Sequence, residues 1–289
     1  MSRERRPEAP NETKPVKRER ITVMELTKDK IERKDLNYSM LRRVIIRADF
    51  TSMLNTGRMV DELNNQEWFK GAFNNYSRLK YADTPQPQEA DPKEEWEPRF
   101  IRRFDDCKLG PEGRVTLDIT NESVCMDIQC DDKYESIDPY LELVVNTLNL
   151  IIANDPYVKM RRLAIRKIDG DNFATSEEAD SVFEYFDQRI TDLEKDSFWQ
   201  RTYTDNFIYG KTGVKVNYSR TVKITPKEGE LFVFILDIDT FLDADMIENV
   251  RPSDKEIRSV FFERLNEASF DLFKRGVKLE FLKSKLRKQ

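Results

Sequence analysis

The chain has 289 residues, with 49 basic, 54 acidic and no histidine side chains, which gives a formal net charge of −5. This length allows one large domain or two domains of about 100–200 residues each. Without histidine there is no Ser-His-Asp or Cys-His catalytic site and no zinc site with imidazole ligands. No apolar run approaches the roughly 18 residues of a membrane span, and the N-terminal residues lack the apolar stretch of a signal peptide. The sequence therefore predicts a cytoplasmic protein with no membrane contact.

Cysteine usage agrees with that compartment. Cys107, Cys125 and Cys130 are an odd number of cysteines without secretory context, which predicts free buried thiols rather than disulfides. A thiolate metal site would need a fourth ligand. In an extended segment Cys125 and Cys130 would also point to opposite faces, because strand side chains alternate.

Charge is unevenly distributed along the chain. Residues 1–50 hold 14 basic and 9 acidic side chains, and residues 82–138 hold 7 basic and 16 acidic side chains. Residues 1–20, rich in Arg, Lys, Glu and Pro, predict a disordered basic arm. Residues 277–289 are interpreted as a basic C-terminal tail. Basic ends leave nucleic-acid contact open, whereas the acidic middle and the overall charge argue against it.

Strand and helix signals divide the rest into a first half, residues 21–155, and a second half, residues 156–276. In the first half we expect strands at 41–50, 99–106, 114–120 and 123–130, a helix at about 58–78, a loop with four prolines at 82–98, and a helix opened by Asp138-Pro139. In the second half we expect strands at 160–168 and 231–239, a hairpin at 205–224, and helices opened by capping boxes at Thr175–Glu178 and Ser253–Glu256.

Short stretches of the two halves resemble each other. Ile45-Ile46-Arg47 follows Arg42-Arg43, as Ala164-Ile165-Arg166 follows Arg161-Arg162. Residues 116–120 resemble residues 235–240 in the same way, and a long amphipathic helix follows each. The predicted fold class is therefore α+β. It would consist of two related halves, each strand–helix–antiparallel strands–helix, packed as one body.

Two strand motifs carry a family resemblance. Residues 162–168 (RLAIRKI) and 236–241 (LDIDTF) are similar to the R-I-G-L-R-Y-I-N and L-D-I-D-x-F strands of a sporadically distributed family of bacterial proteins with no assigned activity. The chain departs from those motifs at Ala164, where glycine is usual, and at Asp169, where asparagine is usual. The resemblance spans about residues 38–276 and implies a shared fold, with genes in mobile or defence-related neighbourhoods. It carries over no catalytic residue.

Charged residues within the predicted strands are the candidate binding residues. Arg47 and Arg166 lie in one pair of similar strands, and Asp118 and Asp237 lie in another. An unpaired charge is costly to bury, so these residues either face solvent at a sheet edge or face a common polar groove. In the groove hypothesis Arg47 pairs with Asp118 and Arg166 with Asp237, and arginine holds a ligand carboxylate or phosphate with two hydrogen bonds.

Two further patterns concern enzyme chemistry. Asp237 and Asp239 share one face of a strand and are the alternative metal ligands, for Mg²⁺. The favoured explanation is a strand that emerges from the core, with polar residues at its end or paired to arginine. Gly210-Lys211-Thr212 ends like a phosphate-binding loop but lacks its first glycine and the following helix, so a β-turn is expected.

These patterns favour a non-enzymatic binding component, for instance of a bacterial conflict or antiviral defence system, that recognises a protein partner and needs no cofactor. A homo-oligomer remains open. Two alternatives also remain open: a carboxylate-dependent, metal-assisted nuclease or hydrolase that uses Asp237 and Asp239, and a small-ligand sensor with a pocket between the halves.

Overall fold

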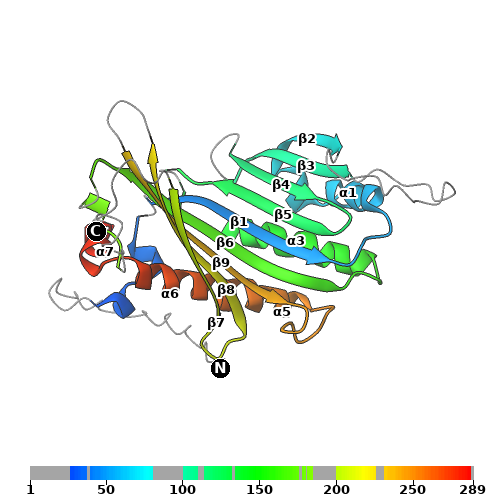
Figure 1. Cartoon of the computed structure of the whole chain (residues 1–289). Coiled ribbons are helices and arrows are strands. Elements are labelled where there is room, and N and C mark those ends of the chain that lie inside the picture. Colours follow the sequence, from blue (N-terminus) through cyan, green and yellow to red (C-terminus); the bar gives the residue numbers. More distant parts are fainter. Residues whose placement is uncertain are drawn as a thin grey trace, which may run out of the picture.

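One antiparallel sheet organises the described part of the chain, with nine strands in the order β2-β3-β4-β5-β1-β6-β9-β8-β7 (Figure 1). A computed structural model describes residues 27–37, 40–80, 100–109, 114–131, 134–175, 178–179, 181–184, 200–225 and 231–287. The strands are β1 (Leu41–Phe50), β2 (Phe73–Lys80), β3 (Phe100–Cys107), β4 (Val115–Ile119), β5 (Ser123–Gln129), β6 (Met160–Phe173), β7 (Gln200–Tyr209), β8 (Val214–Thr225) and β9 (Leu231–Asp243).

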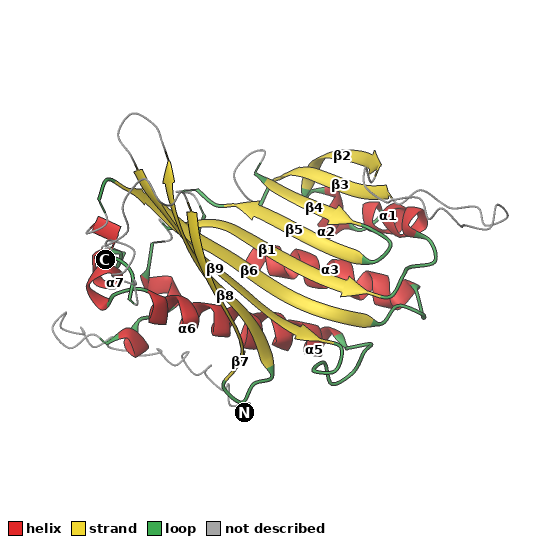
Figure 2. Ribbon diagram, in the orientation of Figure 1, coloured by secondary structure: helices red, strands yellow, loops and turns green. Residues whose placement is uncertain are grey.

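The main helices lie on one face of this sheet (Figure 2). They are α1 (Thr56–Asn64), α2 (Glu67–Lys70), α3 (Asp138–Asn154), α5 (Asp254–Arg258), a π-helical segment (Ser259–Leu265), α6 (Asn266–Gly276) and α7 (Leu279–Ser284), and two 3₁₀ turns, Lys28–Lys30 and Arg33–Asp35, precede β1. The chain is therefore a mixed α and β protein. We call the face that α3 and α6 cover the helix face, and the opposite face the open face.

Alternation along the strands explains why the sheet has two different faces. Successive strand side chains point to opposite sides. In β1 the buried set is Val44, Ile46, Ala48 and Phe50, and the set on the open face is Arg43, Ile45, Arg47 and Asp49. Burial alternates in the same way along β4, β5 and β9. The apolar core therefore lies between the sheet and its helices, and the charged side chains collect on the open face.

Several sequence predictions are confirmed. The strands expected in both halves and the hairpin are present, with turn residues Gly210 and Gly213 at φ values of +53° and +74°. The capping box at Ser253 also forms: Ser253 Oγ accepts from the Glu256 backbone N–H, and the Glu256 carboxylate accepts from the Ser253 N–H at 2.5 Å. Each of these features depends on residues close together in the sequence, so local sequence patterns are enough to predict it.

The helix expected at 58–78 forms only in its first part, as α1 and the short α2, and is wrong for the rest. α1 ends at Asn64, and β2 begins at Phe73. The aromatic rings of this segment pack around Phe104 of β3: the ring centroids of Phe69 and Phe73 lie 4.9 Å and 5.6 Å from that of Phe104. Pairing with β3 therefore overrides the helical spacing of these aromatics.

Other expectations are corrected near the ends of helices. The N-cap of α3 is Ile137, so Asp138 lies inside the first turn rather than at the cap. Phe183 forms a β-bridge to Val277 instead of continuing the helix expected from Thr175. The segment interpreted as a C-terminal tail contains α7, with Leu282 only 1% exposed. The arm at 1–20 and the loop at 82–98 lie outside the described residues.

Candidate functional site

Paired charges cover the open face. Arg166 donates from Nε and Nη2 to the two carboxylate oxygens of Asp237, at 2.8 Å and 2.5 Å. Arg103 holds Asp118 in the same way, at 2.8 Å and 2.7 Å. Two parallel hydrogen bonds between a guanidinium and a carboxylate fix both side chains in direction as well as distance.

Four more pairs extend this arrangement across the central strands. Arg43 binds Asp127, Arg162 binds Asp239 at 2.8 Å, Lys215 binds Asp243 at 2.5 Å, and Arg47 binds Asp49 of its own strand at 2.7 Å. In all six pairs a lysine or arginine meets an aspartate. The open face is therefore rich in charge but locally neutral.

The arginines are more accessible than their partners. The side chain of Arg166 is 47% exposed and that of Asp237 is 19% exposed. The hydrogen bonds to Asp237 raise the pKa of Arg166 above its usual value. Burial raises the pKa of Asp239, while Arg162 opposes that shift. The five arginine pairs therefore present their cationic side to solvent while shielding the carboxylates.

The predicted groove residues are only partly brought together. Arg47 and Arg166 lie on the same face of adjacent strands, with Arg47 opposite Ala164 and Arg166 opposite Ile45. Arg166 and Asp237 are paired, as the groove hypothesis requires. Arg47 and Asp118 are not paired.

Strand order explains why the Arg47–Asp118 pairing is wrong. Strand β5 lies between β1, which carries Arg47, and β4, which carries Asp118. Strands separated by one neighbour are roughly 10 Å apart. Asp118 therefore pairs with Arg103 of β3 on its other side. Asp237 lies on β9, directly beside β6, so the two aspartates do not hold matching positions in the sheet.

A second feature of the open face is a cavity beside Arg47, at one end of the face. A polar cavity of about 240 Å³ lies at the turn between β4 and β5, lined by Arg47, Asp49, Phe50, Thr120, Asn121, Glu122, Ser123 and Arg161. Arg161 and the turn residues were not among the predicted site residues. The sequence signal for Arg161 was the arginine pair, Arg161-Arg162, which precedes the similar triplet at 164–166 as Arg42-Arg43 precedes that at 45–47.

Metal ligation finds no geometric support in the described residues. They contain no group of three or more Asp, Glu, His or Cys side chains arranged to hold a metal ion. Asp237 and Asp239, the alternative metal ligands, are bound by Arg166 and Arg162. The three cysteines are free thiols.

Comparison with known proteins does not identify a family for this chain. No protein-family model matches the chain, and no curated protein matches it in sequence. In the described ranges no helix combines the length and the apolar character that crossing a membrane requires. The function is therefore inferred from the residues of the open face.

Proposed function

We propose that this chain is a binding protein without enzymatic activity of its own, which recognises a protein partner through the open face. One observation carries the proposal: six ion pairs spread over seven neighbouring strands on a face that no described helix covers (Figure 2). The half-exposed guanidinium groups on this face can exchange or share their carboxylate partners.

The chemistry of the face favours a protein over a nucleic acid. Nucleic-acid binding needs an excess of positive charge to neutralise phosphates, whereas each cation of these six pairs is already matched by an aspartate. Arginine is enriched at protein–protein interfaces, where its planar fork binds carboxylates and stacks on aromatic rings. Arg162 already stacks in this way, with its guanidinium carbon 4.4 Å from the centroid of Phe241.

The proposal includes an origin of the fold from two related halves. Support comes from the pairing of the two central strands, in which Ile46 of β1 lies opposite Ile165 of β6. These isoleucines are the central residues of the similar triplets at 45–47 and 164–166. Each central strand also pairs on its outer side with the last strand before a long helical segment, β5 before α3 and β9 before α5.

The cellular setting is part of the proposal and rests on sequence alone. We place the protein in the cytoplasm, where free thiols persist. A role in a bacterial conflict or antiviral defence system follows only from the family resemblance. A second copy of the chain remains one choice of protein partner.

Charge reversal on the open face tests the proposed function. We would compare cross-linked partners from host cells for the wild type, Arg166→Glu and a control, Arg58→Glu, which changes a 73% exposed arginine on α1. The partner should be captured by the wild type and the control and lost with Arg166→Glu. Circular dichroism and the melting temperature must first show that all three are folded.

A charge swap and an activity assay complete the test. Arg166→Asp/Asp237→Arg keeps an ion pair but reverses its direction, so it should fold and still lose the partner. Equal capture by all variants would contradict the proposal. So would hydrolysis of nucleotides, nucleic acids or peptides with Mg²⁺ or Mn²⁺ that Asp237→Ala abolishes, because that result would favour the metal-dependent enzyme.

A further inference from the structure

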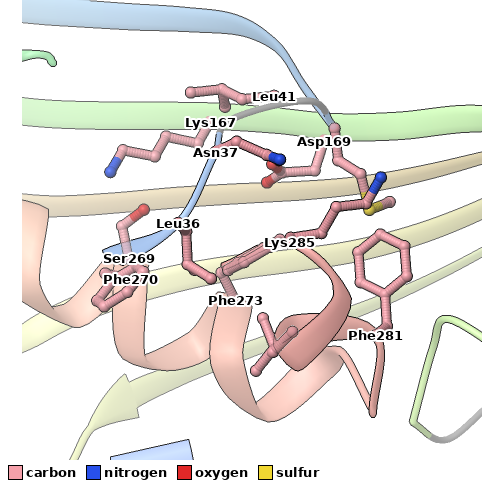
Figure 3. A pocket seen from close by; sticks show the side chains of 12 residues that line it. Leu36, Asn37, Leu41, Lys167, Asp169, Ser269, Phe270, Phe273, Phe281 and Lys285 are labelled. Atoms are coloured by element: carbon pink, nitrogen blue, oxygen red, sulfur yellow. The ribbon is translucent and has the colours of Figure 1, made fainter. Parts of the chain in front are cut away.

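A second, different cavity lies on the helix face, between β6 and the two C-terminal helices (Figure 3). Its walls come from distant parts of the chain: the segment that leads into β1, strand β6, α6 and α7. Its volume is about 40 Å³. Among the lining residues Phe281 and Lys285 are partly buried, and Asn37 is exposed.

Three polar side chains line this cavity although each is more than nine-tenths buried. Lys167, Asp169 and Ser269 are 8%, 5% and 0% exposed. Lys167 Nζ donates one hydrogen bond, of 2.7 Å, to Asn266 Oδ1. Ser269 Oγ is buried without a hydrogen-bond partner. A buried polar group without a partner is costly, so a ligand that bonds the Ser269 hydroxyl would remove that cost.

The remaining wall is apolar and largely aromatic. Phe270, Phe273 and Phe281 line it together with Leu36, Leu41 and Leu282. A mainly apolar wall with a few polar groups is the usual composition of small-molecule sites, which are generally larger, at roughly 300–1,000 Å³. A ligand here would place a polar head at Asp169 and Ser269 and an apolar body along the rings.

We propose that this cavity binds a small, uncharged, hydroxyl-bearing molecule with an apolar body. A hydroxyl group donates one hydrogen bond and accepts others. It would donate to Asp169 and accept from Ser269 or Lys167. A charged head is disfavoured, because it would have to leave water for a wall in which Lys167 and Asp169 are themselves more than nine-tenths buried.

Cavity size limits the ligand. The volume of about 40 Å³ accommodates a hydroxyl group and its first carbon atoms, whereas a longer apolar body would extend out of the cavity. This inference does not depend on the proposed function, because the cavity and the open face lie on opposite sides of the sheet.

A series of probes that differ only in the head group tests the proposal. We would titrate the protein with 1-butanol, its isomer methyl propyl ether, butylamine and butyrate. Chemical shifts of isotope-labelled methionine methyl groups would be followed. Met40 lines the cavity, and Met246 serves as a distant reference. Saturable shifts confined to Met40 should appear with 1-butanol. The ether should bind at least about fivefold more weakly, because it cannot donate to Asp169.

Variants test the same residues independently. Asp169→Leu and Ser269→Ala should each weaken 1-butanol binding, by about tenfold for the loss of the carboxyl acceptor and less for the loss of the hydroxyl. Asp171→Asn, an exposed change on the same strand, is the control and should bind normally. The proposal fails if no probe saturates, if the ether binds as well as the alcohol, or if Asp169→Leu binds 1-butanol like the wild type. It also fails if either charged probe binds more tightly than the alcohol.

Discussion

Lys167 and Asp169 lie two residues apart on β6, and both side chains point to the helix face rather than to water. Burial lowers the pKa of Lys167 to about 7 and raises the pKa of Asp169 to about 7. Each shift favours the neutral form of the group. The layer between the sheet and its helices therefore holds two buried groups that change charge near neutral pH.

Asp169→Asn is expected to stabilise the protein at pH 7 but not at pH 5. The unfolded carboxyl titrates near 3.8, whereas the folded one keeps its proton up to about pH 7. Between these values the native state binds more protons, so the stability of the wild type falls as pH rises. Urea unfolding gives the free energy of unfolding of both proteins. The value for the variant minus that for the wild type should be about 2 kcal/mol larger at pH 7 than at pH 5. An equal difference at both pH values would contradict the raised pKa of Asp169.

Gly170→Ala should destabilise the fold. A Cβ atom at Gly170 would lie 2.4 Å from the backbone oxygen of Phe234 in the paired strand β9, so the strands would have to move apart. Overpacking of this kind costs about 1–3 kcal/mol. Gly71→Ala is the matched control, because a Cβ atom there meets nothing within 4 Å. Thermal unfolding should separate the two variants, and equal melting temperatures would show that β6 and β9 can adjust.

The ion pair between Arg166 and Asp237 should contribute little to folding. Its guanidinium is about half exposed, and exposed pairs contribute under about 1 kcal/mol. A double-mutant cycle with Arg166→Ala and Asp237→Ala, measured by urea unfolding, should give a coupling in that range. A coupling of about 3 kcal/mol or more would mean that the open face serves stability rather than binding.

The thiols should be unreactive in the native protein. Burial raises the pKa of Cys125 to about 11 and that of Cys130 to about 12, and it also raises the pKa of Cys107. Thiol reagents attack the thiolate form. Labelling with a chromogenic disulfide at pH 8 should therefore be much slower for the folded protein than in urea. Rapid, stoichiometric labelling of the folded protein would contradict this expectation.

Local sequence signals account for most of the fold. The β-branched run of β1, the two-glycine hairpin turn and the Ser253 capping box each depend on neighbouring residues, so each is readable from sequence. The segment at 58–78 is not, because β2 forms only by pairing with β3.

The candidate site was less predictable because it depends on strand order. Asp118 and Asp237 occur in similar stretches of sequence, but one lies two strands from its expected arginine and the other lies one strand away. Nothing local encodes that difference. The cavity could have been predicted from the alternation of side chains along β6. Leu163, Ile165, Lys167 and Asp169 share one face of this strand, so two ionisable residues follow two apolar residues on the buried face.

The matched charges of the open face also determine how a partner would arrive. Because opposite charges cancel within a few ångströms, the six pairs produce little field beyond the Debye length of about 8 Å at physiological salt. Encounter with a partner would then proceed at the unsteered rate of about 10⁵–10⁶ M⁻¹s⁻¹ and respond weakly to ionic strength. Discrimination between partners would appear in how slowly the right complex dissociates.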